Sequence, residues 1–406
     1  MEPAFEPINR LSATLRSRIS EVIQAHLGAL FPALTLAVIC RGEWMLETAW
    51  GYVDPETRRH PTAPDTLFDL ASVTKVFTAT TFLSLVNEGR VKLDDPLVKV
   101  IPEFGASGPR PMDGGQDPHT RVMLPVPEEV RHQYADPAAV MFWHLLTHTS
   151  GLAPWRAVYD AAGPMPPPPD MPDVLSTEER WANALPALCA YPFVGQPASR
   201  VRYSDLGMML LGAAVARLTG QTLDAAIAER VTNPLGLVSV TYNPVRNGRN
   251  RDHIAPTEYD AFWRGRRCWG EVHDENACGL GGVSGHAGLF GTTRDVARFG
   301  QAWLEGDERL KIAPQLMALA KTEQMVSDGE RRGLGWMLKS ADSPAGELLS
   351  AASFGHNGFT GTSLWVDPER QLVAACLTNR VYPGRHQEGI HAFRQTLHTI
   401  LAEELS

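Results

Sequence analysis

The chain has 406 residues, of which 44% are apolar and 20% are charged, and its formal net charge is -9. This composition is typical of a globular protein with a large core, and it excludes a chain that is disordered throughout. The acidic balance argues against nucleic acid or an anionic membrane as the main partner, so we predict neither. The cysteines are odd in number and scattered, which predicts buried free thiols at Cys40, Cys189, Cys268, Cys278 and Cys376.

Apolar residues from Ile8 to Leu27 recur at helical spacing, with arginines between them, and predict an amphipathic helix. This N-terminal segment lacks the basic start and the unbroken apolar core of a signal peptide. No later segment is apolar for long enough to span a bilayer, so we expect no transmembrane segment. As written, the chain is expected in the cytoplasm, and a trimmed export signal would make it periplasmic or secreted.

Both ends of the chain contain runs typical of β-strands. Residues 34–40 and 44–50 flank the turn residues Arg41-Gly42-Glu43 and predict a hairpin. Residues 362–367 and 371–377 form a second pair, and a helix containing Ile390 and Leu401 follows it. We expect the strands from the two ends of the chain to pair with each other.

Ser72 and Lys75 lie three residues apart at the start of an apolar run, so they share one face of a predicted helix. A serine hydroxyl becomes a nucleophile only when a base takes its proton. Lysine can do this if burial or a nearby positive charge lowers its pKa, so we expect Lys75 to be partly buried. The N-terminus of the helix would also stabilise negative charge beside Ser72.

Two stretches of the chain do not resemble the helices and strands that form the framework of a fold. Residues 104–136 are rich in Gly, Pro and charge, and residues 163–172 contain six prolines, so both predict loops. Variable surface decoration is the favoured interpretation, and the alternative is a lid or rim that shapes access to a site. Further along, His148 lies where a predicted helix ends in Gly151. There its side chain is expected to satisfy backbone groups of the loop.

Two later segments carry polar residues next to apolar ones. Tyr203 and Asp205 precede an apolar helix, and His356-Asn357-Gly358 precedes a predicted strand. Taken singly, Tyr203 could be a half-buried aromatic residue, Asp205 an N-cap, and the third segment a polar turn.

The segment from His273 to Asn276, followed by His286, invites a metal interpretation. Paired histidine spacing and a cysteine cluster are both missing from the sequence, so we predict no metal. Two interpretations stay open for this segment. It could recognise an amide or a sugar, or it could be a hydrogen-bonded loop that orders the floor of a cleft.

Together and in this order, Ser72-x-x-Lys75, Tyr203-Ser-Asp205 and His356-Asn-Gly358 resemble the three active-site motifs of the serine β-lactamase and penicillin-binding protein family. The resemblance is closest to the class C branch, through residues 144–152, 233–237 and 333–336. Residues 270–277, 281–290 and 377–381 resemble a subgroup that contains penicillin-binding protein 4B-like proteins and exo-acting N-acetylmuramyl-L-alanine amidases.

The resemblance implies an α/β (α+β) fold of the β-lactamase/transpeptidase type, in which terminal helices cover an antiparallel sheet and the site lies between the sheet and a helical region. It implies one catalytic domain over residues 1–406, with the sheet at about 1–65 and 290–406 and the helices at about 66–289. It also implies that Lys75 and Tyr203 share the work of the general base for Ser72 and that no cofactor is needed. The residues expected at the substrate or oxyanion are Asp205, His356, Asn357, Gly358, Phe359, His273 and Asn276.

Within this mechanism, the charge of Lys75 is expected to favour the phenolate of Tyr203 and so to bring the pKa of that phenol closer to working pH. The tetrahedral oxyanion is expected between the backbone N–H groups of Ser72 and Phe359.

Two departures from the family pattern argue against an optimised β-lactamase. Asp205 replaces the usual asparagine, so a donor amide becomes an acceptor-only carboxylate when ionised. His356 replaces the usual lysine, which removes a fixed positive charge from the wall that receives a penicillin carboxylate.

The predicted function is that of a serine hydrolase acting through an acyl-enzyme on an amide or ester of a small molecule, with a muropeptide or D-alanyl peptide as main candidate. The alternatives are a promiscuous carboxylesterase with weak β-lactamase activity and a non-catalytic penicillin-recognising protein. The sequence leaves the oligomeric state open.

Overall fold

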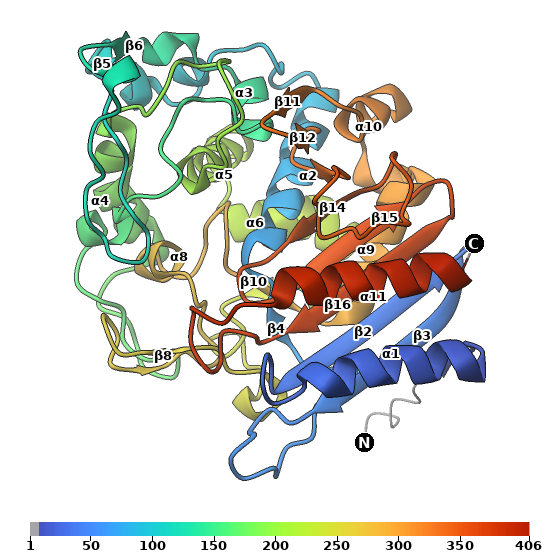
Figure 1. Cartoon of the computed structure of the whole chain (residues 1–406). Coiled ribbons are helices and arrows are strands. Elements are labelled where there is room, and N and C mark those ends of the chain that lie inside the picture. Colours follow the sequence, from blue (N-terminus) through green and yellow to red (C-terminus); the bar gives the residue numbers. More distant parts are fainter. Residues whose placement is uncertain (1–7, 406) are drawn as a thin grey trace.

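The structure is a computed structural model that describes residues 8–405, so the expectation about the first seven residues lies outside the described residues. Over this range the strands form a large antiparallel sheet in the order β1-β3-β2-β16-β15-β14-β13-β12-β11 (Figure 1). Its strands are β1 (Ile8–Asn9), β2 (Ala33–Cys40), β3 (Glu43–Gly51), β11 (Met325–Ser327), β12 (Glu330–Arg332), β13 (Met337–Leu338), β14 (Phe354–Asn357), β15 (Ser363–Asp367) and β16 (Leu372–Thr378). The predicted fold class is confirmed.

The two ends of the chain meet in the middle of this sheet. Strand β2 pairs with β16 from Cys40 opposite Leu372 to Leu34 opposite Thr378, as the sequence predicts. The predicted hairpin is also present, because β2 pairs with β3 around Arg41 and Gly42, whose φ angles of 54° and 77° match the twist of a tight hairpin turn.

Helices cover both faces of the sheet. Helices α1 (Ala13–His26) and α11 (Ile390–Glu404) lie side by side on one face, and α9 (Thr293–Glu305) packs on the other against β2, β15 and β16 (Figure 1). The N-terminal helix begins at Ala13 and not at Ile8, where the periodicity predicted it. Ser12 caps the helix by accepting from the N–H of Leu15, and the segment before it pairs with β3 instead.

The middle of the chain is mainly helical, as predicted. Its helices are α2 (Thr74–Asn87), α3 (Phe142–Leu146), α4 (Thr177–Ala190), α5 (Asp205–Thr219), α6 (Leu223–Ile227), α7 (Asn233–Leu235) and α8 (Glu275–Gly279). It also holds strands that the sequence did not predict. One small sheet contains β4 (Phe68–Asp69), β10 (Leu289–Gly291) and β7 (Thr241–Tyr242), and its strand β4 precedes the turn that enters α2. In a second small sheet, β8 (Tyr259–Asp260) pairs with β9 (Arg266–Arg267).

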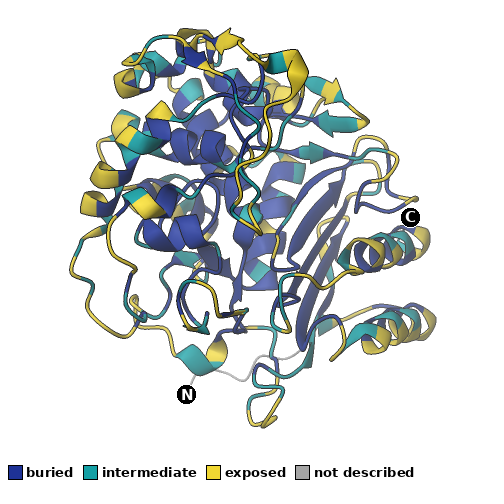
Figure 2. Cartoon of the chain, turned by 60° about the vertical axis from the view of Figure 1, so that its left-hand side comes forward, coloured by how far each residue is buried: buried dark blue, intermediate teal, exposed yellow. Residues whose placement is uncertain are grey.

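The core joins both regions. Helix α2 is buried along almost its whole length (Figure 2), and one apolar cluster contains Ile39 of the sheet, Phe77 of α2 and Leu211 of α5. Helices α9 and α10 (Pro314–Ala320) lie in the part of the chain assigned to the sheet from sequence. The single domain over residues 1–406 stays a prediction.

Other predictions from sequence can be compared with the described chain. The cysteines are buried and free, as expected. Residues 163–172 contain neither helix nor strand, and the ends of the 104–136 stretch are tied together by β5 (Arg110–Pro111) and β6 (Tyr134–Ala135). In the described residues no single helix is long and apolar enough to cross a membrane, although the bent pair Asp205–Thr219 and Leu223–Leu235 meets that test by length and composition.

Candidate active site

The candidate nucleophile lies on a strained turn that enters α2. Ser72 is the middle residue of a single 3-10 turn, Ala71–Val73, directly before the first residue of the helix. Ala71 has a φ of 45°, which is unusual for a residue with a Cβ atom, and its N–H donates to Asp69 at 2.8 Å. Such strain is found at functional sites, where the surrounding structure holds it in place.

Lys75 on α2 contacts Ser72 with its buried side chain. Its side chain is 1% exposed, and Nζ lies 2.7 Å from Oγ of Ser72, 2.8 Å from Oδ1 of Asp205 and 2.9 Å from the carbonyl oxygen of His286. The predicted burial and the predicted contact with Ser72 are therefore present.

The condition set out from the sequence, a lowered pKa of Lys75, is not met in the resting protein. Burial acts to lower this pKa, but the charges of Asp205 and Tyr203 raise it, and the net direction is upward. Because Asp205 stands where the family has a neutral amide, Lys75 is held as a cation in the resting protein.

Tyr203 lies over the same group. Nζ of Lys75 is 4.8 Å from the centroid of its ring, and the guanidinium carbon of Arg332 is 5.3 Å from it. Burial raises the pKa of Tyr203, Lys75 lowers it, and Asp205 raises it again, so the net direction is upward. The charge of Lys75 acts in the predicted direction, but it does not bring the phenol closer to working pH.

His148 supports Tyr203, in line with the structural role predicted for it. Its ring packs against that of Tyr203 with the centroids 4.6 Å apart, and Nδ1 accepts from the N–H of Ser204 at 3.1 Å. Burial holds the pKa of His148 well below its usual range, so the ring is a neutral acceptor.

Asp205 is the first residue of α5 and not its cap. The side chain of Ser204 caps the helix by accepting from the N–H of Gly207. The Asp205 carboxylate is therefore available to Lys75, and it lines the cavity with 19% of its side chain exposed.

The third motif brings β14 against the nucleophile turn. A Cβ atom on Gly358 would lie 2.0 Å from Oγ1 of Thr362 and 2.7 Å from the carbonyl oxygen of Leu70. Only glycine allows this approach. Among the described residues the backbone N–H groups of Ser72 and Phe359 have no acceptor, which is what an oxyanion hole requires of its donors.

His356 is neutral and partly unpaired. Its Nδ1 lies 3.0 Å from the carbonyl oxygen of Asn357 and donates to it, whereas Nε2 is buried without a partner among the described residues. Burial holds the pKa of His356 well below its usual range, and the charges of Lys75 and Arg332 act in the same direction. Neutral His356 therefore does not replace the charge of the family's lysine.

One cavity of about 510 Å³ joins these groups. It is lined by Ser72, Tyr203, Asp205, His273, His356, Asn357, Gly358 and Phe359 among the predicted residues, and by Pro118 and His119 from the 104–136 stretch. The presence of Pro118 and His119 favours the interpretation of that stretch as a rim of the site.

Asn276 lies outside the cavity and is fully buried. Its Oδ1 accepts from the N–H of Tyr159 at 3.0 Å, and its Nδ2 donates to the carbonyl oxygen of Arg156 at 2.9 Å. With its Oδ1 and its Nδ2 both bonded to backbone groups, Asn276 orders the loop and does not line the cavity.

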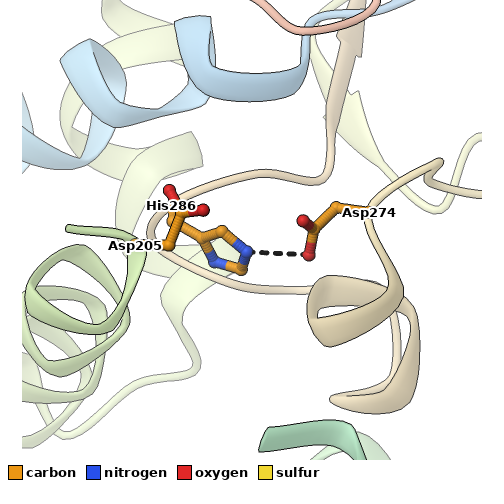
Figure 3. A group of neighbouring side chains, drawn as sticks. All are labelled: Asp205, Asp274 and His286. Carbon is orange, nitrogen blue, oxygen red and sulfur yellow. Dashed lines mark hydrogen bonds and ion pairs between the residues drawn. The ribbon is translucent and has the colours of Figure 1, made fainter. Parts of the chain in front are cut away.

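Asp274 and His286 line the cavity but were not predicted as site residues. Nε2 of His286 lies 2.8 Å from Oδ1 of Asp274, and Figure 3 shows Asp205 beside the same ring. The three side chains offer atoms within 4.8 Å of one another that could hold a cation. However, Asp205 is paired with Lys75, and the His286 nitrogens with Ser284 and Asp274. The Gly-rich segment at residues 281–290 is the sequence feature that could have indicated His286 as a residue of the site.

Replacing Asp205 by asparagine is expected to move the ascending limb of the pH profile of acylation to lower pH, by about one unit. The sign follows from its charge, which raises the pKa of both Lys75 and Tyr203, so its loss frees a base at lower pH. Burst kinetics with a p-nitrophenyl ester across the pH range measure this limb. Asp328→Asn, on an exposed turn, is the matched control, and an unmoved limb in Asp205→Asn would contradict the assignment.

Comparison with known proteins agrees with this geometry. The family model described as Beta-lactamase matches residues 19–397. A putative D-alanyl-D-alanine carboxypeptidase of Escherichia coli (strain K12) is 31% identical over 376 residues, which cover 86% of this chain and 79% of the relative.

Two solved structures share the fold across their length. EstCE1, a hydrolase with promiscuous acyltransferase activity, has a TM-score of 0.68 and 20% identity, with 96% of this chain and 98% of that chain covered. The D-amino acid amidase of Ochrobactrum anthropi SV3, in complex with L-phenylalanine, has a TM-score of 0.67 and 20% identity, with coverages of 97% and 100%.

Proposed function

The chain belongs to the β-lactamase family of serine hydrolases, and we propose that it hydrolyses a cell-wall-derived amide, either a D-alanyl peptide or a muropeptide, through an acyl-enzyme on Ser72. The observation that carries this proposal is the contact of Ser72 with buried Lys75 at the edge of an open cavity. Hydrolysis of an amide needs an activated nucleophile and donors for the oxyanion, and both are at hand here.

In the first step, Oγ of Ser72 attacks the carbonyl carbon and gives up its proton. We assign the base to Lys75 and Tyr203 as one unit, because the charge of Tyr203 acts to raise the pKa of Lys75 and the charge of Lys75 acts to lower the pKa of Tyr203. The amine of Lys75 or the phenolate of Tyr203, whichever is deprotonated, accepts the proton of Ser72, while the Asp205 carboxylate holds Lys75 in place at 2.8 Å. The net result is one proton taken from Ser72 and shared within the group.

The oxyanion then lies between the backbone N–H groups of Ser72 and Phe359, whose positions are fixed before the reaction. Tyr203 returns a proton to the leaving amine, and the acyl-enzyme remains. Water hydrolyses it in the second step with Tyr203 as base, by the reverse of the same proton path.

The amide substrate is supported by the name of the relative in Escherichia coli, a putative D-alanyl-D-alanine carboxypeptidase. The cavity volume of about 510 Å³ suits a small ligand or the end of a peptide.

A carboxylesterase is the second candidate. Apolar side chains line part of the cavity, among them Trp155, Met337 and Phe359, and His356 presents no positive charge there. These features suit a neutral ester. The fold neighbour EstCE1, a hydrolase with promiscuous acyltransferase activity, supports this second candidate.

A substrate panel distinguishes the candidates. The purified protein is incubated with a D-alanyl-D-alanine peptide, a muropeptide, a short p-nitrophenyl ester and a penicillin, and products and acyl-enzyme are followed by mass spectrometry. We expect turnover of a peptide or muropeptide and slow acylation by penicillin, because Asp205 adds a negative charge and His356 is neutral. Turnover of the ester with none of the peptides would favour the esterase, and rapid penicillin hydrolysis would contradict both.

A further inference from the structure

A buried arginine from the C-terminal helix reaches the backbone of the third motif. Arg394 of α11 is 6% exposed, and its Nη2 donates to the carbonyl oxygens of Gly358 at 2.9 Å and of Thr362 at 2.7 Å. Its Nε is buried and has no partner among the described residues. The mechanism above gives this side chain no task.

The first acceptor of Arg394 belongs to the peptide group that supplies an oxyanion donor. The carbonyl of Gly358 and the N–H of Phe359 are the two ends of one planar, conjugated peptide unit. A cation at the carbonyl end draws electron density toward the oxygen, so the N–H at the other end becomes a stronger donor. Arg394 can therefore influence the oxyanion hole without contacting the substrate.

The positive charge of Arg394 has no counter-ion in the resting protein. Both acceptors are neutral carbonyls, and within residues 8–405 the guanidinium forms no ion pair with a carboxylate. Burial lowers the pKa of Arg394 to about 10, which leaves it charged at neutral pH. Burying a cation without a counter-ion is costly. The negative charge that would balance it arises beside Phe359 when the oxyanion forms.

A second arginine fixes the residue that bears this N–H. Nε of Arg380 donates to the carbonyl oxygen of Phe359 at 3.0 Å, and the guanidinium carbon lies 4.8 Å from the centroid of the Phe359 ring. Oγ1 of Thr362 donates to the carbonyl oxygen of Leu70, which directly precedes the nucleophile turn. The peptide group that Arg394 contacts is therefore held beside Ser72 before the reaction begins, as an oxyanion donor must be.

We propose that Arg394 is a positioning residue of the oxyanion hole, which holds the peptide group between Gly358 and Phe359 in place and polarises it, so that its N–H stabilises the negative charge of the transition state. Arg394 touches neither the substrate nor the reacting atoms. The proposal rests on the proposed acyl transfer at Ser72, but it applies to an amide and to an ester alike, because both form an oxyanion.

The test uses diethyl fluorophosphate, a small probe that is independent of the natural substrate. Oγ of Ser72 forms a bond to phosphorus, the P–F bond breaks with loss of fluoride, and the phosphoryl oxygen takes the place of the oxyanion. KI measures binding of the neutral probe, and kinact measures the height of the chemical barrier. The phosphorus NMR resonance of the folded adduct, compared with that of the urea-denatured adduct, measures the hydrogen bonding of the phosphoryl oxygen.

The variants are Arg394→Gln, which removes the charge but keeps a polar donor, and Arg394→Lys, which keeps the charge. Arg110→Gln is the matched control. Arg110 is also buried and also donates to two backbone carbonyls, but it does not line the cavity. Its guanidinium lies 4.3 Å and 4.4 Å from the ring centroids of Phe104 and Phe193, so aromatic faces balance its charge.

We expect Arg394→Gln to lower kinact by about 10- to 100-fold with KI within about threefold of the wild type, and to move the resonance of the folded adduct toward that of the denatured one. Arg394→Lys should lose less, about three- to tenfold in kinact, because lysine carries the charge on a shorter side chain. Arg110→Gln should leave kinact and the resonance unchanged. An unmoved resonance, or a loss that affects KI as much as kinact, would overturn the proposal. If Arg394→Gln does not fold, wild-type values in Arg394→Lys would overturn it.

The same measurements separate this inference from the proposed function. A folded wild type that takes up no adduct would reject Ser72 as the nucleophile and the role of Arg394 with it. An adduct that forms equally fast in the wild type and in Arg394→Gln would reject the role of Arg394 alone. A kinact that depends on Arg394, in a protein that turns over esters but no peptide, would support the inference and reject the amide substrate.

Discussion

Replacing Ser72 by alanine is expected to reduce hydrolysis of every substrate by about 1,000-fold or more. The reason is chemical, because the hydroxyl of Ser72 lies 2.7 Å from the amine of Lys75 and next to the two oxyanion donors. The fold should survive, because Ser72 is partly exposed and its hydroxyl contacts Lys75 within the site. Loss of a hydroxyl at such a position leaves no large core cavity.

The measurement is steady-state turnover together with the mass of the intact protein after treatment with a fluorophosphonate. The wild type should gain one adduct, and Ser72→Ala should gain none. Ser84→Ala is the matched control, since Ser84 lies on the same helix but bonds to the carbonyl oxygen of Thr81, away from the cavity. An adduct on Ser72→Ala, or turnover close to that of the wild type, would place the nucleophile elsewhere. A wild type that takes up no adduct while folded would favour a non-catalytic protein.

Replacing Lys75 by methionine should cause a loss of similar size in acylation, for a different reason. Methionine fills much of the same volume but offers no amine that can accept the proton of Ser72. The buried amine also makes three polar contacts, at 2.7 Å to Ser72, 2.8 Å to Asp205 and 2.9 Å to His286. All three are lost at once.

Lys75→Met should also lower stability, by about 1–3 kcal/mol, because Asp205 is left as an unpaired and mostly buried carboxylate. The double variant Lys75→Met with Asp205→Asn separates the two effects. It removes the unpaired charge and should recover much of the unfolding free energy without recovering acylation. Urea unfolding and the acylation burst measure the two quantities. An unaltered acylation rate in Lys75→Met would exclude Lys75 from the base, and recovery of activity in the double variant would attribute the loss to folding alone.

The chemistry of the site shows where sequence reasoning succeeds. The contact of Ser72 with Lys75 is fixed by a spacing of three residues at the start of one helix, so local geometry alone predicts it. The β2–β3 hairpin is likewise encoded by a few residues at Arg41 and Gly42. In both cases the interacting groups are neighbours in the chain.

The same site shows where sequence reasoning fails. Burial of Lys75 was predicted, but its pKa moves upward because Asp205, 130 positions away in the sequence, supplies a carboxylate at 2.8 Å. Asn276 is a residue type suited to binding a ligand, yet its Oδ1 and its Nδ2 both bond to backbone groups of a distant loop. Neither outcome is visible until the partners are placed.

By itself, the sequence determined the family, the fold class, the pairing of strands from the two ends and the helix that carries Ser72 and Lys75, because motifs and periodicity record short-range geometry. Only the tertiary structure decided the charge of Lys75, the neutrality of His356 and the place of Arg332 in the cavity wall. A pKa depends on burial and on the charges nearby, and the lining of a cavity depends on which strands lie side by side. Both are products of contacts between residues far apart in the chain, which no local pattern of residues specifies.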